Sequence, residues 1–286
     1  MKPAPFAHHA PRSLDEAVAV LGEVGHDGKV LAGGQSLIPM LSMRLAAPAH
    51  LIDINGVAGL DTIEVTPDAV RVGATVRHRA LERSEHAYAV LPLLRQALVK
   101  VAHPAIRNRG TTVGSIAHAD AAGEMPSIAV LTDAVIEVRG PGVAREIPAH
   151  EFFTGPLETA LAADELVIAV RFGRFPAGTV TGFVESARRS GDYALAGVGV
   201  AIHGADDAVI AARASFVSVT DVPDVLDLSP VLAGATASDL AARADDLVTA
   251  VREHVAPEAD IHASADYRRM LAAELTRRLV AEVMSA

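Results

Sequence analysis

The sequence contains no cysteine and no tryptophan, and its aromatic rings are limited to three tyrosines and seven phenylalanines. Without cysteine the chain can form no disulfide, no thiolate zinc site, no catalytic thiol and no cysteine-ligated iron–sulfur cluster of its own. Few aromatic rings leave little material for a base-stacking platform or a cation cage. Any iron–sulfur chemistry linked to this chain must therefore be held by another chain.

Positive charge is also scarce, since 25 Lys and Arg face 35 Asp and Glu, a formal net charge of −10. No basic run offsets this locally, so nucleic acid and anionic lipid would both be repelled. The longest charge-free stretches, such as 30–43, are shorter than the roughly 18 apolar residues of a membrane helix. The first residues resemble neither a signal peptide nor a transit peptide. We therefore expect a cytoplasmic protein with no membrane span and no nucleic-acid partner.

Half of the 286 residues are apolar, enough for more than one average domain. The first segment predicts a small parallel α/β unit. Ser13 and Glu16 form a capping box that begins a helix, and strands are expected at 29–32 and 51–54 on either side of a helix at 37–46.

The middle of the chain predicts an α+β arrangement. An antiparallel hairpin is expected at 62–72, helices at 79–85 and 92–102, a second hairpin turning at 140–142, and a strand at 166–172. Phe-Pro-Ala-Gly at 175–178 is the best signal for a domain boundary, because it contains both proline and glycine and no apolar periodicity is present on either side of it.

We therefore divide the chain into a domain 1–175, with sub-domains of about 1–55 and 56–175, and a domain 176–286. For the second domain the sequence predicts a three-stranded meander with strands at 179–186, 195–203 and 209–219. Two amphipathic helices are expected to follow it, at 238–254 and 265–283. The last helix carries an apolar stripe flanked by arginines: Met270, Leu271, Leu275 and Leu279, with Arg268, Arg269, Arg277 and Arg278.

Two glycine segments are candidates for binding a phosphate. Gly33, Gly34, Gln35 and Ser36 join a strand to a helix N-terminus, where free N–H groups attract anions and glycine lets the backbone approach a ligand. Neither a GxGxxG fingerprint nor a Walker lysine is present, so spacing alone leaves an empty tight turn equally open. The segment 110–115, Gly-Thr-Thr-Val-Gly-Ser, is of the same kind, and the pair indicates a diphosphate held from two sides.

Other chemistry receives little support. Glu124 could accept bonds from ligand hydroxyls, or could simply stabilise a helix N-terminus. His118 and Asp120 form an H-x-D pair without a third ligand at a recognised spacing, so no metal site is assigned. No G-x-S-x-G or H-E-x-x-H motif occurs, so hydrolysis is unsupported and no catalytic residue is named. Tyr193, in the turn 188–193, could lie against a flat ring or be a half-buried turn residue.

Five segments in order along the chain resemble the FAD-binding, or medium, subunit of the molybdenum hydroxylases of the xanthine dehydrogenase and carbon monoxide dehydrogenase type. They are AGGQSLIPMLSMRLAAPAHLIDI, RNRGTTVGSIAHADAAGEMP, FFTGPLETALAADEL, ARRSGDYALAGV and DYRRMLAAELTRRLV. The resemblance implies a two-sub-domain FAD-binding domain of the vanillyl-alcohol oxidase-like (PCMH) type, followed by a three-stranded antiparallel sheet with a helical bundle.

The resemblance also implies a function and partners. FAD on this chain would pass electrons from [2Fe–2S] clusters of a small subunit to an external acceptor, while a large subunit holds molybdopterin, in a heterohexamer of the (αβγ)2 kind. The FAD contacts that it implies are Ala32, Gly33, Gly34, Gln35, Ser36, Leu37, Thr111, Gly114, Ser115, Glu124, Leu166, Asp192 and Tyr193.

Three positions depart from the family pattern. The family usually has glycine at Val113, commonly proline at Ala121 and often histidine at Gln35. A side chain at Val113 would push the backbone away from the ligand. A free-standing FAD-dependent oxidase and a flavin-free scaffold that keeps the fold are the alternative functions.

Overall fold

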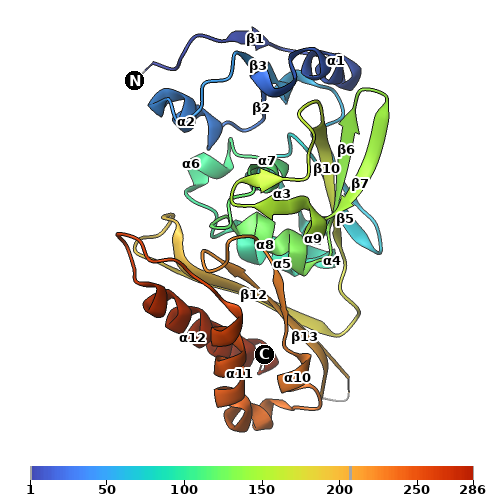
Figure 1. Cartoon of the computed structure of the whole chain (residues 1–286). Coiled ribbons are helices and arrows are strands. Elements are labelled where there is room, and N and C mark those ends of the chain that lie inside the picture. Colours follow the sequence, from blue (N-terminus) through green and yellow to red (C-terminus); the bar gives the residue numbers. More distant parts are fainter. Residues whose placement is uncertain (1, 206–207, 286) are drawn as a thin grey trace.

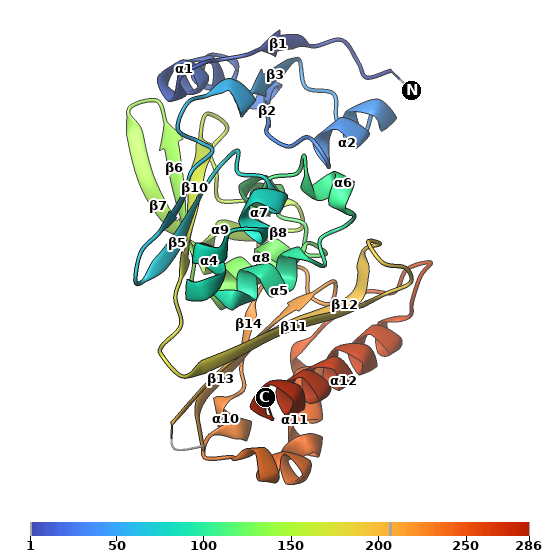
Figure 2. The ribbon, with the colours of Figure 1, turned by 180° about the vertical axis from the view of Figure 1, so that it is seen from behind.

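The computed structural model describes residues 2–205 and 208–285. Three layers are stacked along the molecule (Figure 1): a small N-terminal sheet, a middle layer of one sheet with several helices, and a C-terminal sheet with two long helices. The same order is seen from behind (Figure 2), where α12 lies along β11. In the described part of the chain, no helix is both long and apolar enough to cross a membrane.

The N-terminal layer is the expected parallel unit. Its three strands have the order β1-β3-β2 and are all parallel: β1 (Ala7–His9), β3 (His50–Asp53) and β2 (Gly28–Leu31). Helix α1 (Leu14–Val24) begins where the Ser13 hydroxyl accepts the Glu16 N–H, and the Glu16 carboxylate accepts the Arg12 N–H at 2.7 Å. Helix α2 (Leu37–Met43) follows the first glycine segment. Strand β1 was not predicted, because three residues are too few to show a periodicity.

The middle layer contains an antiparallel sheet of order β4-β5-β10-β6-β7. Its strands are β4 (Ile63–Val65), β5 (Ala69–Gly73), β10 (Leu166–Gly173), β6 (Val135–Gly140) and β7 (Val143–Pro148). The small elements are β8 (Phe153–Gly155), β9 (Glu158–Thr159), η1 (Gly25–Asp27) and η2 (Ile54–Gly56). The helices are α3 (His78–Glu82), α4 (Glu85–Val90), α5 (Pro92–Leu98), α6 (Pro104–Arg107), α7 (Thr112–His118), α8 (Glu124–Leu131) and α9 (Ala149–Phe152). The α+β class is confirmed.

The C-terminal layer contains one strand more than predicted. Its antiparallel sheet consists of β11 (Thr179–Ala187), β12 (Ala194–Ala205), β13 (Ala208–Val217) and β14 (Val225–Asp227). Its helical elements are α10 (Ser229–Leu232), η3 (Ala237–Asp239), α11 (Leu240–His254) and α12 (Ala265–Met284). Strand β14 spans three residues beside β13, too short for an alternating pattern to reveal.

The C-terminal sheet is covered on both faces. A Cβ at Gly199 would lie 3.2 Å from Leu131 of α8, whereas one at Gly182 would lie 2.7 Å from Leu279 of α12. Residues from Met125 to Leu131 of α8 are all buried, because the helix packs on α5 and α7 as well as on β12 and β13. Helix α8 therefore packs on both the middle layer and the C-terminal sheet and connects them.

The apolar stripe predicted for α12 packs on the core at Leu271, Leu275 and Leu279 but not at its first residue. Met270 is 43% exposed, while Arg268 is only 7% exposed. The Arg268 guanidinium donates to the Leu195 carbonyl and to the Asp260 carboxylate, both at 2.7 Å. The apolar periodicity placed Arg268 on the helix surface. The structure buries it, and these hydrogen bonds satisfy its guanidinium there.

A buried ion pair supports the segment that leads to the second glycine loop. Arg107, at the end of α6, places Nε 2.9 Å from the Glu82 carboxylate, and both side chains are at least nine-tenths buried. The same guanidinium donates to the carbonyls of Val101 and Ala102 at 2.9 and 3.0 Å. Its orientation is therefore fixed from three directions.

Replacing Glu82 by alanine should destabilise the fold by about 3–5 kcal/mol, because it leaves a buried guanidinium without its counter-charge. Glu64→Gln, at a pair whose carboxylate is 58% exposed, is the matched control and should cost less than about 1 kcal/mol. Urea unfolding of both variants measures this. Equal losses would contradict the assignment.

Candidate functional site

The two glycine segments are in direct contact, although about 80 residues separate them. A Cβ at Gly33 would lie 2.5 Å from the Arg109 carbonyl oxygen, 2.6 Å from the Gly110 Cα and 2.8 Å from the Thr111 nitrogen. Real Cβ atoms do not approach backbone so closely, so this position requires glycine. On the other side of the contact, Gly114 lies beside Ala32. The two segments that the sequence assigns to one ligand are therefore neighbours in the fold, while their contact with a diphosphate stays a prediction.

The first segment is a tight turn between β2 and α2. Gly34 has φ +73°, a conformation that glycine adopts without penalty. The Gln35 side chain turns back and donates to the Gly33 carbonyl at 3.1 Å. Ser36 is exposed and, within the described structure, its hydroxyl does not cap α2. The backbone around Leu37 is therefore free to face a ligand.

The second segment is the beginning of a helix rather than a loop. Thr111 is the N-cap of α7 and its hydroxyl accepts the Gly114 N–H at 3.1 Å. Ser115 donates its N–H to the Thr111 carbonyl at 3.0 Å. Val113 is 2% exposed and packs in the core. The expectation that its side chain pushes the backbone outward is thus corrected, since the side chain points away from the first segment into the core.

Glu124 begins α8 in surroundings that favour its neutral form. Burial, with a smaller contribution from the nearby carboxylates of Glu185 and Asp120, raises its pKa to about 8. Burial likewise raises the pKa of Glu185 to about 7. A protonated carboxyl both donates and accepts hydrogen bonds. Glu124 is therefore suited to pairing with the hydroxyl groups of a ligand.

Tyr193 stands close to these carboxylates although it belongs to the other domain. It lies with Asp192 in the turn between β11 and β12 and is 68% exposed. Partial burial raises the pKa of its phenol, and the carboxylates of Asp120 and Glu124 add to the rise. Gly191, at φ +85°, lets the turn pack on the His103 ring. The turn is thereby held over the region between the domains.

A cavity of about 910 Å³ opens beneath this turn, at the far end of α7 from the glycine contact. Its walls come from both domains and include Asp120, Ala121, Leu157, Tyr193, Ser218 and Arg268. Ser218 bridges the domains by donating its N–H to the Ala121 carbonyl at 2.9 Å. The volume is within the range of organic cofactor sites.

Leu166 lies in β10, is 4% exposed and belongs to the core of the middle layer. Its contact with the cofactor stays a prediction from the resemblance.

Asn55 and Arg77 lie at the glycine contact, although no sequence motif marks them. The Asn55 amide donates to the Ala32 carbonyl at 2.8 Å, and the Arg77 guanidinium reaches both Asn55 and the Arg109 carbonyl. Asn55 stands two residues after β3 and Arg77 four residues after β5, and a polar residue soon after a strand is the signal that could have drawn attention to them.

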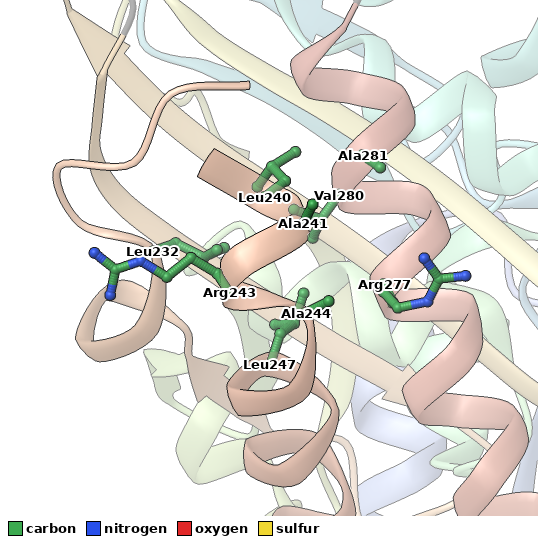
Figure 3. A pocket seen from close by; sticks show the side chains of 9 residues that line it. All are labelled: Leu232, Leu240, Ala241, Arg243, Ala244, Leu247, Arg277, Val280 and Ala281. Carbon is green, nitrogen blue, oxygen red and sulfur yellow. The ribbon is translucent and has the colours of Figure 1, made fainter. Parts of the chain in front are cut away.

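Two other features carry no comparable chemistry. Among residues 2–205 and 208–285, no group of three His, Asp or Glu side chains is placed so that it could hold a metal ion. A smaller apolar cavity of about 200 Å³ lies between α10, α11 and α12 (Figure 3), with Arg243 and Arg277 at its edges. It belongs to the C-terminal helices.

Because Glu124 keeps its proton in the folded chain up to pH of about 8, while the unfolded chain releases it near 4.5, stability should fall as pH rises through this window. Glu124→Gln should remove the part of this pH-dependent loss of stability that Glu124 causes. The ligand-free variant should then be more stable than wild type at pH 8. Urea unfolding at pH 5 and 8 tests this, with exposed Glu23→Gln as the control. A wild-type-to-variant difference that is equal at both pH values would contradict it.

Comparisons with known proteins agree with this geometry. Residues 4–174 match the FAD binding domain in molybdopterin dehydrogenase, and residues 182–283 match the CO dehydrogenase flavoprotein C-terminal domain. The chain is 40% identical to the nicotine 6-hydroxylase medium subunit of Paenarthrobacter nicotinovorans, over 99% of this chain and 98% of that protein. It is 36% identical to the carbon monoxide dehydrogenase medium chain of Hydrogenophaga pseudoflava, over 97% and 96%.

Solved structures give the same result. CO dehydrogenase from Oligotropha carboxidovorans superposes with a TM-score of 0.93 at 32% identity, and quinoline 2-oxidoreductase from Pseudomonas putida 86 with 0.92 at 33%. Each match covers 100% of this chain and 99% of the other. The chain therefore belongs to the FAD-binding medium subunits of the molybdenum hydroxylase family, which are components of oxidoreductase complexes.

Proposed function

We propose that FAD lies across the contact between the two glycine segments, with its diphosphate against Gly33, Gly34 and the start of α7. Its hydroxyl-bearing part would reach Glu124, and its ring would reach Tyr193. The observation that supports this placement is the close contact at Gly33, where a Cβ would collide with the backbone of Arg109 to Thr111, so that both glycine turns border one region. The N–H groups of Gln35 and Ser36 stand beside it, and backbone donors suit a diphosphate.

The residues at the other end of the site fit a flat ring and its polyol chain. Glu124 can exchange hydrogen bonds with hydroxyls because its pKa of about 8 keeps it largely protonated near neutral pH. Tyr193 can cover one face of a ring, and the cavity beneath it accommodates the other face. When bound, FAD would supply the redox chemistry. The chain itself would bind, orient and shield it.

We further propose that electrons reach this chain from [2Fe–2S] clusters on a small subunit and leave it for an external acceptor. The chain has no cysteine with which to hold a cluster. Relatives are named as medium chains, which supports assembly with a large molybdenum-binding subunit and a small one, in an (αβγ)2 heterohexamer. Cytoplasmic location stays a prediction from the sequence.

The substrate pocket would lie on the large subunit. Relatives that cover nearly the whole chain are named for nicotine, carbon monoxide, caffeine and glyceraldehyde. Such different molecules are consistent with a substrate site outside this fold. We also propose a domain division near residue 175, supported by the family matches that end at 174 and begin at 182.

Co-expression with the neighbouring large and small chains tests the function. We expect a yellow complex with one FAD per medium chain and flavin reduction that requires the partners. A colourless complex that takes up no added FAD would refute the proposal. Flavin reduction by an organic substrate in the medium chain alone would instead support a free-standing oxidase.

Gly33→Ala should weaken FAD binding by at least about tenfold, because its Cβ must push the two segments apart and at least one charge-assisted hydrogen bond is lost. Gly142→Ala is the control, since it strains a turn at φ +70° but its Cβ meets no atom within 4 Å. It should lower stability by roughly 1–2 kcal/mol and leave the FAD dissociation constant unchanged. Fluorescence titration with FAD distinguishes the two variants.

Tyr193→Ala should weaken riboflavin binding about two- to tenfold, the value of roughly 0.5–1.5 kcal/mol for an aromatic pair. Tyr193→Phe should retain the affinity, and Tyr88→Ala, at another exposed tyrosine, should not change it. ADP affinity should be the same in all three variants. Loss of ADP binding together with riboflavin binding would place the ring elsewhere.

A further inference from the structure

Arg77 and Asn55 connect the two glycine segments by a continuous series of hydrogen bonds. The Asn55 Nδ2 donates to the Ala32 carbonyl at 2.8 Å, and its Oδ1 accepts from Arg77 Nη2 at 2.6 Å. Arg77 Nη1 then donates to the Arg109 carbonyl at 2.5 Å. The two carbonyls at the ends of this series immediately precede Gly33 and Gly110. The series thus spans the same gap as the proposed diphosphate cradle.

Backbone pairing holds the second segment, but the first is held differently. The His78 N–H donates to the Gly110 carbonyl at 2.9 Å, the Thr112 N–H to the Val76 carbonyl at 3.3 Å, and Arg77 bridges to Thr111. The stretch 76–78 therefore fixes the second segment whatever side chain stands at Arg77. The side chain at Arg77 adds the link to the first segment, through Asn55.

The charged side chains near Arg77 also favour the binding of an anion. Burial lowers the pKa of Arg77, and the positive charge of the neighbouring Arg109 lowers it further, while Asp53 opposes this. The Asp53 Oδ1 is already engaged by the Asn55 N–H groups at 2.6 and 3.0 Å. Two guanidinium groups and one carboxylate therefore act on each other near the glycine contact. A diphosphate there would relieve their repulsion.

We propose that Arg77 and Asn55 are positioning residues that set the spacing of the two glycine segments, and that Arg77 also favours the negative charge of the diphosphate. The inference rests on the proposed FAD site. It adds two residues to that site, neither of which contacts the reacting ring. Arg77 sets the spacing of the segments and also favours the negative charge of the diphosphate. Asn55 is uncharged and only sets the spacing.

Three full-length variants separate these functions: Arg77→Gln, Asn55→Ala and the control Arg174→Gln. Arg174 also donates to a backbone carbonyl, that of Pro67 at 3.0 Å, in another part of the middle layer. Dissociation constants for FAD, ADP and riboflavin are measured at low and high salt, together with the melting temperature. Riboflavin lacks the diphosphate and reports on the ring end alone.

Arg77→Gln should weaken FAD and ADP binding about ten- to hundredfold, as expected for hydrogen bonds that involve a charged group. It should also reduce the salt dependence of binding, since one cation is lost. Asn55→Ala should weaken both by up to about tenfold with the salt dependence unchanged. Riboflavin binding should be the same as in wild type for both, and Arg174→Gln should match wild type throughout.

Several results would overturn the inference. Arg77→Gln within twofold of wild type for FAD would exclude both functions, and an unaltered Asn55→Ala would exclude the bridging function. If Arg77→Gln unfolds, Arg77→Lys decides: retained salt dependence with weaker ADP binding supports the inference, and wild-type affinity overturns it. Failure of the wild-type chain to bind FAD, alone and with its partners, would instead refute the proposed function itself.

Discussion

The contact between Gly33 and the backbone of Arg109 to Thr111 is the constraint on which the site depends. It brings together the end of a parallel strand and the beginning of a helix from two different sub-domains. No side chain takes part on the Gly33 side, so the two backbones come closer than any other residue type permits. The turn that follows Gly33 and the beginning of α7 thereby border one small region, which is where we place the diphosphate.

The same arrangement extends to the ring end through two short helices. Helix α7 begins at the glycine contact and ends at Ala119, and α8 then places Glu124 beside the C-terminal domain. Because α8 is buried against β12 and β13, it fixes the distance between Glu124 and the Tyr193 turn. In the proposed placement, FAD extends from the glycine contact along α7 to the cavity beneath Tyr193.

Much of the fold could be predicted because local signals agreed with the final packing. The Ser13 N-cap of α1 and the antiparallel hairpins are found where their residues indicate, although Glu16 accepts the N–H of Arg12 and not that of Ser13. The errors share a cause, which is burial that depends on distant parts of the chain. Arg268 is buried because Leu195 and Asp260 supply partners, and Val113 points inward because α7 packs on the core. Asn55 and Arg77 form their bridge only after three loops come together.

A site built from backbone contacts has a consequence for how such a subunit can be used. Side chains around a backbone cradle can vary without loss of its shape, provided that the glycine positions and the bridging groups are kept. Relatives at 30–40% identity are named for a heterocyclic alkaloid, carbon monoxide and an aldehyde. If the cofactor is held as proposed, none of that chemistry needs to reach this chain. The fold then needs to present one ring edge to its partners and to keep the diphosphate fixed, and both tasks depend on the spacing of the two glycine segments.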